Sequence, residues 1–318
     1  MALDFPSTAV SECSPAMRVR SLFIPLLLLI GACDVIEAPY FDPEALAQLP
    51  ADAQCLIEAQ QQPDFDPAPG SVPKRVLLEE MTGHKCGNCP RAGEMAYDLT
   101  RVQHPDRVYL VSIHAGPLAN SSPTASKYFT DFTTEEGDAY FTTLNQANAV
   151  PYGMIDRVDQ GTNHNAWPGF VEARLQETPI SALRIFNCYD PDSGSLGTVV
   201  DVKYFADAPA SERLCVFLVE DGIVDWQTDY SAPNGSPDIP DYVHHDVLRG
   251  SLNGTWGQPL RTDSNGDPQP VKSGETFTHS YGYQIPDHFE AANCKIVAFT
   301  YDFDTQEVRQ VEVMPIVF

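Results

Sequence analysis

Basic residues are scarce in this sequence. Its 318 residues include 19 Lys and Arg against 44 Asp and Glu, which leaves a formal net charge of −25. Nucleic acids are bound through basic surfaces, so this balance excludes nucleic acid as a natural partner. Long apolar runs are also missing. The run SLFIPLLLLI at residues 21–30 is too short for a membrane-spanning helix, which needs about 20 residues, and no later segment has that composition.

Length and composition predict about two folded domains that are not mostly helical. A chain of 318 residues exceeds the roughly 100–200 residues of one typical domain. Apolar residues make up 43%, which is enough for each domain to bury a core. The 27 prolines and 20 glycines favour strands, turns and an extended linker over a mostly helical fold.

The N-terminal residues have the order of a lipoprotein signal peptide. A short basic region at residues 17–20 precedes the apolar run, and Ile30-Gly31-Ala32-Cys33 follows it. This tetrapeptide resembles the lipobox of bacterial lipoproteins, which implies that residues 1–32 are removed and that Cys33 carries the lipid. Residues 1–16 lack signal character, so Met17 is the expected initiator. An uncleaved anchor with an incidental cysteine is the alternative.

Residues 33–73 are expected to form a tether between the lipid anchor and the folded chain. Acidic residues are scattered through the segment together with prolines, a composition typical of extended linkers. Residues 51–61 are the exception, because their apolar positions fit a short docked helix that begins just after Pro50. The prolines of the segment are Pro39, Pro43, Pro50, Pro63, Pro67, Pro69 and Pro73.

A Cys-X-X-Cys motif follows the tether. Residues 75–81 have the apolar pattern of a buried strand, and a helical pattern begins at Pro90, so Cys86 and Cys89 lie at a strand-to-helix junction. The unpaired N–H groups and the dipole of a helix N-terminus stabilise a thiolate. Cys86 is therefore the expected nucleophile and Cys89 the resolving thiol, with added positive charge from Lys85.

The next hundred residues supply further α/β elements. Residues 107–115 read as a second buried strand, residues 128–147 as helical and residues 166–176 as a closing helix. Between the helices, Pro151 stands at the start of a short apolar strand. Proline is unusual in a central sheet, and a cis Val150–Pro151 bond would explain it.

This order of elements resembles the thioredoxin fold over residues 74–178, on the strength of Cys86, Cys89 and Pro151. The resemblance implies that the loop at Pro151 pairs with the backbone of a substrate while Cys86 attacks its disulfide. It also implies that Glu80 is the buried acid that accepts a proton from Cys89. No cofactor is implied, because the two thiols carry the electrons themselves.

Three longer motifs resemble the outer membrane protein 28-related family of lipoproteins. They are EEMTGHKCGNCP at residues 79–90, VPYGMIDR at residues 150–157 and YVHHDVLR at residues 242–249. The resemblance spans most of the mature chain. It implies a lipid-anchored protein of the bacterial envelope, expected at the outer membrane and facing either the periplasm or the cell surface.

Residues 179–318 are expected to form an immunoglobulin-like β-sandwich, so the fold class is α/β followed by all-β. About seven short strand patterns, separated by turn clusters, occupy this region. The expected role is interaction or substrate presentation. The strand candidates are residues 182–188, 198–206, 214–220, 243–252, 276–284, 295–303 and 307–313.

Cysteine counting suits an oxidising compartment. Cys13 leaves with the signal peptide and Cys33 is lipidated, so four cysteines remain beside the Cys-X-X-Cys pair. They allow three connectivities. Cys215 and Cys294 both lie near the start of predicted strands, which favours a bridge between them and leaves Cys55 to pair with Cys188.

Several other interpretations are open at this stage. The Cys-X-X-Cys pair can be a static disulfide, or it can join His84 and His114 in binding a metal ion. His244 and His245 are adjacent on a strand and point to opposite faces, which disfavours a shared ion. The acidic segment at residues 263–267 superficially resembles a calcium loop but lacks its Gly and closing Glu, so a turn is expected.

Two functions of different classes follow. The first is a membrane-tethered thiol–disulfide oxidoreductase that acts on exported proteins, or with a redox partner protein, through Cys86, Cys89, Glu80 and Pro151. The second is a binding or adhesion lipoprotein in which the thioredoxin-like domain is a scaffold. An exposed Cys86 of lowered pKa favours the first function, and a buried, inert bridge favours the second.

Overall fold

The computed structural model describes residues 49–122, 126–232 and 235–317. The residues expected to form the signal peptide, the lipid-carrying Cys33 and the first part of the tether lie outside the described residues. Within them, no helix combines the length and apolar character needed to cross a membrane. All described residues belong to one compact unit.

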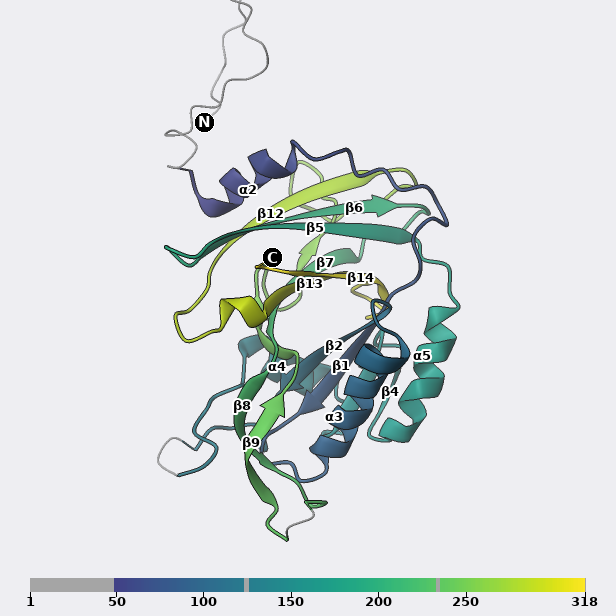
Figure 1. Cartoon of the computed structure of the whole chain (residues 1–318). Helices are drawn as coiled ribbons and strands as arrows, with labels where there is room; N and C mark the ends of the chain where they lie inside the picture. Colours follow the sequence, from purple (N-terminus) through teal and green to yellow (C-terminus); the bar gives the residue numbers. More distant parts are fainter. Residues whose placement is uncertain (1–48, 123–125, 233–234, 318) are drawn as a thin grey trace, which may run out of the picture. The chain divides into compact units, whose positions relative to one another are not determined.

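A mixed nine-stranded sheet forms the centre of this unit (Figure 1). Its strands follow the order β14-β13-β7-β10-β2-β1-β3-β4, and β11 pairs with β7 off this path. β1 and β2 are parallel, and a single bridge between Val247 and Ser112 joins β10 in parallel to β2. The bounds are β1 Val76–Thr82, β2 Val108–His114, β3 Tyr152–Ile155, β4 Asp159–Gly161, β7 Glu212–Glu220, β10 Val247–Ser251, β11 Gln258–Pro259, β13 Cys294–Asp302 and β14 Val308–Pro315.

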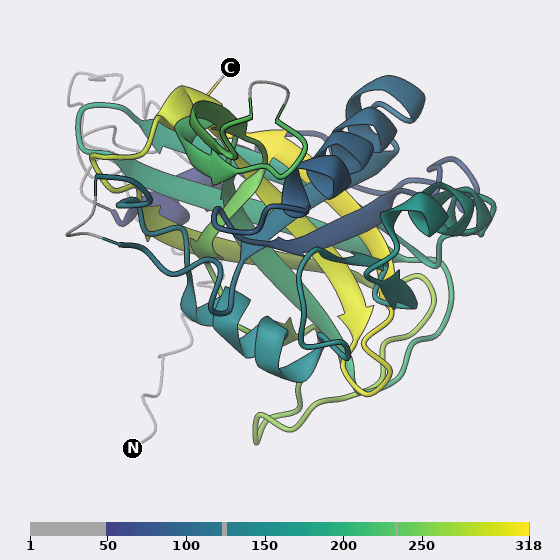
Figure 2. The same ribbon diagram turned by 90° about the horizontal axis from the view of Figure 1, so that it is seen from below.

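Helices cover both faces of β1 and β2, as Figure 2 shows. On one face, α3 (Cys89–Tyr97) and α5 (Trp167–Leu175) pack against the apolar side chains of β1 and β2. On the other face lies α4 (Glu135–Thr143). Burial on both faces explains why β1 carries apolar residues on both of its faces, since all seven of its residues are buried.

The helix expected over residues 128–147 is only α4. Tyr128 has a positive φ of 57°, which no helix accommodates. The helix begins after Thr134, whose side-chain oxygen accepts a hydrogen bond from the Gly137 backbone N–H at 3.0 Å. The apolar residues ahead of this cap, including the buried Phe132, lie in a loop.

A separate three-stranded antiparallel sheet has the order β12-β6-β5. The strands are β5 (Ser181–Asp190), β6 (Ser195–Tyr204) and β12 (Thr276–Gln284). One face of this sheet packs on β7 and β13 through an apolar core that includes Val200 and Ile296. The short helix α2 (Ala51–Ala59) lies against the other face, where Cys55 is buried beside Val199 (Figure 1).

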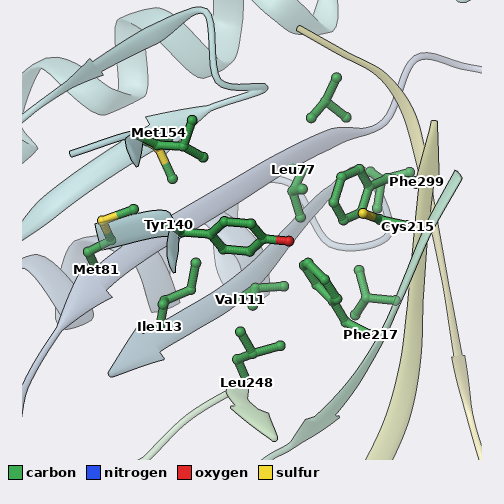
Figure 3. Packing of buried hydrophobic residues seen from close by; sticks show 14 of the residues in the cluster. Leu77, Met81, Val111, Ile113, Tyr140, Met154, Cys215, Phe217, Leu248 and Phe299 are labelled. Atoms are coloured by element: carbon green, nitrogen blue, oxygen red, sulfur yellow. The ribbon is translucent and has the colours of Figure 1, made fainter. Parts of the chain in front are cut away.

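Strands from residues 74–178 and from residues 179–318 share one sheet and one hydrophobic core. Figure 3 shows Leu77 and Tyr140 from the first segment in a single cluster with Phe217 and Phe299 from the second. The strand expected over residues 243–252 is divided into β9 (Asp238–His244) and β10. Asp246 breaks the run because it has a positive φ of 53°. β9 pairs with β8 (Ile223–Thr228) in a two-stranded hairpin.

Candidate functional site

Cys86 and Cys89 form a disulfide where β1 passes into α3. The turn between them is tight: the Cys86 N–H donates to the Gly83 carbonyl at 2.9 Å, and the Cys89 N–H donates to the Cys86 carbonyl at 3.2 Å. Pro90 follows in the first turn of α3, where its missing N–H costs nothing. The strand-to-helix junction that the sequence predicts is therefore present, and both cysteines are buried, with 3% and 2% of their surface exposed.

Pro151 lies beside this disulfide. The Val150–Pro151 peptide bond is cis, as expected, and it precedes β3, which runs antiparallel to β1. The Cys86 sulfur is 3.7 Å from the Val150 carbonyl oxygen. The fold thus brings together two motifs that lie 64 residues apart in the sequence.

The β8–β9 hairpin covers the loop between the two cysteines. The Tyr230 N–H donates to the Gly87 carbonyl at 2.9 Å, the Thr228 N–H to the His84 carbonyl at 2.8 Å, and the Gln227 side chain to the Cys86 carbonyl at 3.0 Å. A Cβ atom at position 87 would lie 2.5 Å from the Tyr230 ring, so this position requires glycine. Tyr230 as a whole residue remains 72% exposed. Sequence reasoning missed these hairpin residues.

Glu79 and Glu80 face opposite sides of β1, as strand alternation predicts. Glu79 accepts two hydrogen bonds from the guanidinium of Arg157, at 2.6 and 2.7 Å, inside the core. The neighbouring Asp156 is buried as well and binds both Lys74, at 2.6 Å, and Arg174, at 2.9 Å. The last two residues of the VPYGMIDR motif, Asp156 and Arg157, are therefore structural ion-pair residues.

Glu80 is buried on the α3 side of β1 without a charged partner. Burial raises the pKa of Glu80 to about 8, and its Oε1 atom has no hydrogen-bond partner among the described residues. Glu80 and Cys89 line the same small cavity, of about 40 Å³. This is the position that the thioredoxin resemblance implies for a proton acceptor.

Three histidines lie near this cavity. The ring centroids of His114 and His244 are 5.3 Å apart, those of His84 and His114 are 6.5 Å apart, and Phe132 touches all three rings. Burial lowers the pKa of His244 to about 4 and holds the pKa of His114 well below its usual range. Both rings are therefore neutral near pH 7. His245 instead turns to the surface, where it bonds Asp221 at 2.8 Å.

The arrangement of His84, Cys86, Cys89 and His114 gives no support to the metal hypothesis. The two sulfurs are bonded to each other, and the described residues contain no group of three or more His, Cys, Asp or Glu placed to hold a metal ion. At residues 263–267 the Asp263 carboxylate accepts the N–H groups of Asn265 and Asp267 at 2.8 and 3.0 Å, so this acidic segment is a turn.

Of the two disulfides expected among the remaining cysteines, the Cys55–Cys188 bond is present and the Cys215–Cys294 bond is not. Cys55 on α2 is joined to Cys188 on β5, while Cys215 and Cys294 are free and buried. The bridge expected between Cys215 and Cys294 is wrong because of the sheet register. Cys215 lies opposite Phe299 and Cys294 opposite Glu220, and the two thiols belong to clusters on opposite faces of the sheet.

Comparison with known proteins gives one family and several structures. The family model for Outer membrane protein Omp28 matches residues 138–316, more than half of the chain. This match includes Pro151, His244 and His245 but not Cys86 and Cys89. A search of the curated proteins found no match.

Among solved structures, HBP35 of Porphyromonas gingivalis is similar with a TM-score of 0.56 and 16% identity, over 77% of this chain and 76% of that chain. This likeness supports the fold alone. Protein AGR_C_4864 of Agrobacterium tumefaciens matches at a TM-score of 0.45 and 11% identity, over 78% and 96% of the two chains. A domain of the outer membrane lipoprotein Omp28 of P. gingivalis matches at a TM-score of 0.27 and 22% identity, over 43% and 95%.

Proposed function

The chain belongs to the Outer membrane protein Omp28 family, and we propose that it is a lipid-anchored thiol–disulfide oxidoreductase of the bacterial envelope. The family's name indicates the outer membrane as its location. In this proposal residues 1–32 are the signal peptide, Cys33 carries the lipid and residues 33–73 form the tether. Residues 74–178 are a thioredoxin-like unit, and residues 179–318 supply an immunoglobulin-like sandwich that presents substrates or partners.

One observation carries the proposal. The Cys86–Cys89 disulfide lies at the start of α3, beside the Val150–Pro151 loop, and Glu80 lines the cavity behind Cys89. The helix N-terminus stabilises negative charge on a sulfur at this position. The carbonyl of Val150, next to the Cys86 sulfur, offers a backbone group to an extended substrate. A buried acid beside Cys89 supplies a place for the proton of the resolving thiol.

The reaction balances without a cofactor. The Cys86 thiolate attacks a disulfide of an exported protein, forms a mixed disulfide and releases one substrate thiolate. Cys89 gives its proton to the Glu80 carboxylate and attacks the Cys86 sulfur. The Cys86–Cys89 disulfide forms, the second substrate thiolate leaves, and two electrons have passed to the substrate. The same steps in reverse oxidise a substrate dithiol.

A second candidate is a binding lipoprotein whose Cys86–Cys89 pair is a structural bridge. The observation that favours it is the burial of Cys86, which is only 3% exposed beneath the β8–β9 hairpin. The hairpin lies against the loop next to Cys86, where Tyr230 contacts Gly87. A permanently closed hairpin would make the pair inert.

The redox potential of the pair distinguishes the two functions. The mature protein is equilibrated in a graded series of thiol–disulfide buffers and alkylated, and the peptide that contains Cys86 and Cys89 is read by mass spectrometry. The oxidoreductase is expected to show a reversible transition between roughly −270 and −120 mV. A pair that stays oxidised below roughly −300 mV contradicts the proposal and supports the structural bridge. The Cys55–Cys188 disulfide, read in the same samples, is the internal control for a structural bond.

A further inference from the structure

The cavity behind Cys89 is lined by polar groups from four different elements. Strand alternation and register place Glu80 of β1 next to Ser112 of β2 on the face toward α3, and His114 follows two residues later on that face. The hairpin supplies the opposite wall through Gln227 of β8 and His244 of β9. None of the hairpin residues belongs to the segment that resembles thioredoxin.

Several of the buried polar atoms around this cavity have no hydrogen-bond partner among the described residues. They are Oε1 of Glu80, both ring nitrogens of His114 and Nε2 of His244. Buried polar atoms in proteins almost always have a partner, either protein or ordered water. A polar cavity of about 40 Å³ has room for one or two water molecules that can both donate and accept hydrogen bonds.

Glu80 needs a hydrogen-bonded path to solvent if it is to accept protons repeatedly. Its side chain is buried, and a carboxyl group whose pKa is about 8 carries a proton most of the time at neutral pH. It must lose this proton before it can take another from Cys89. Neutral histidines are suited to the transfer, because one ring nitrogen accepts a proton while the other donates one.

We propose that the cavity is a proton-relay site in which water connects Glu80 to His114 and His244, and through them to solvent beside His245. This inference rests on the proposed oxidoreductase function and deepens it. In each cycle Cys89 gives a proton to the Glu80 carboxylate, and the relay carries that proton outward along the hairpin. His114 and His244 touch no reacting sulfur, so they are positioning residues that act through Glu80.

Other titratable groups surround the relay and set its electrostatics. Arg249 of β10 and His84 oppose protonation of His114, while Asp225 of β8 favours protonation of His244. The phenol of Tyr242, whose pKa burial raises further above its usual range, faces Glu80. The outer end of the relay, His245, pairs with Asp221 at the surface.

The test follows two consecutive steps in one stopped-flow experiment on the full mature protein. The chain is reduced under conditions that leave Cys55–Cys188 oxidised, which mass spectrometry checks, and it is then mixed with 5,5′-dithiobis(2-nitrobenzoate). Attack by Cys86 releases the first thionitrobenzoate. Attack by Cys89 on the Cys86 mixed disulfide releases the second and closes the Cys86–Cys89 bond, so only the second step requires the proton of Cys89 to leave.

His114→Gln, His244→Gln and the double variant are compared with the wild type between pH 5 and 9, in H₂O and D₂O. His279→Gln is the matched control, because His279 is another histidine with an unpartnered buried nitrogen, on β12. The first step is expected to keep its rate. The second step is expected to slow by about a hundredfold in the double variant near neutral pH, the lower end of what positioned proton transfer contributes. Added imidazole is expected to restore it partly.

The possible results distinguish a failure of the proton relay from a failure of the proposed oxidoreductase function. A second step that keeps its wild-type rate, pH profile and isotope effect in the double variant would overturn the relay and leave the oxidoreductase intact. Equal slowing of both steps would show a structural effect of the histidines and would also overturn the relay. If the reduced wild-type protein releases no thionitrobenzoate at all, the proposed function fails, and the relay fails with it.

Discussion

The ion pair between Glu79 and Arg157 permits a sharp test of how the core is held together. Arg157→Met removes a guanidinium that donates two hydrogen bonds, at 2.6 and 2.7 Å, to a carboxylate with no exposed surface. The guanidinium also lies over the rings of Tyr140, Phe299 and Tyr301 at 4.9 to 5.3 Å. Methionine fills most of the volume and keeps the contact with these rings, so the lost charge dominates the effect.

The expected cost is large because Glu79 is left as an uncompensated buried charge. Removal of one partner of a buried ion pair costs about 3–5 kcal/mol. For a domain of this size, that loss of unfolding free energy corresponds to a decrease in Tm of roughly 6–20 °C. A double variant, Glu79→Leu with Arg157→Met, removes both charges and is expected to recover most of the loss.

Urea unfolding, followed by the fluorescence of the three tryptophans, measures the change in unfolding free energy. The matched control is Arg261→Met, which breaks a 2.7 Å ion pair to Glu275 whose side chains are 41% and 34% exposed. This exposed pair is expected to contribute at most about 1 kcal/mol. The reasoning is refuted if Arg157→Met costs no more than Arg261→Met, or if the double variant is less stable than the single one.

The remaining predictions concern the cysteines, Glu80 and the hairpin. Cys188→Ser is expected to lower the unfolding free energy by about 2–5 kcal/mol, measured in urea, and an unchanged midpoint would contradict this. Burial raises the pKa values of the free thiols Cys215 and Cys294 to about 12, so iodoacetamide is expected to label them in urea but not in the native protein. Burial also raises the folded-state pKa of Glu80 to about 8. The protonated carboxyl therefore stabilises the fold fully below about pH 4.5. This contribution falls as the pH rises and is lost by about pH 8. Glu80→Gln is expected to flatten this part of the curve of Tm against pH, and a parallel curve would contradict it. Tyr230→Ala is expected to speed the reduction of Cys86–Cys89 by dithiothreitol about fivefold, which corresponds to roughly 1 kcal/mol of lost contact energy. Tyr97→Ala on α3 is the control, because Tyr97 is also exposed, and it is expected to leave this rate unchanged.

The parts of the site that the sequence predicts are those encoded locally. An apolar run followed by Cys-X-X-Cys and Pro90 is enough to place Cys86 and Cys89 where β1 passes into α3. Pro151, directly before β3, is a local signal of the same kind, because proline has few allowed positions in a sheet. The alternation along β1 also assigns Glu79 and Glu80 to opposite faces correctly.

The parts of the site that the sequence does not predict depend on contacts between distant segments. The hydrogen bond from Gln227 to Cys86 joins residues 141 apart, and no local pattern marks the β8–β9 hairpin as the cover of the Cys-X-X-Cys loop. The unpaired state of Cys215 follows from the register of β7 against β13, which strand propensity does not determine. The turn at Asp246 lies inside residues 243–252, a segment that reads as one strand.

The disulfide between α2 and β5 also determines how the protein carries mechanical load. Tension applied to the chain ahead of Ala51 enters the fold at Cys55 and passes through a covalent bond to Cys188, in a strand paired along its whole length with β6. The segment between Cys55 and β1 bears none of that tension while the bond is intact. Tension from the preceding chain is therefore passed to β5 and the ladder that it shares with β6, and not along the chain to the Cys-X-X-Cys region at the end of β1.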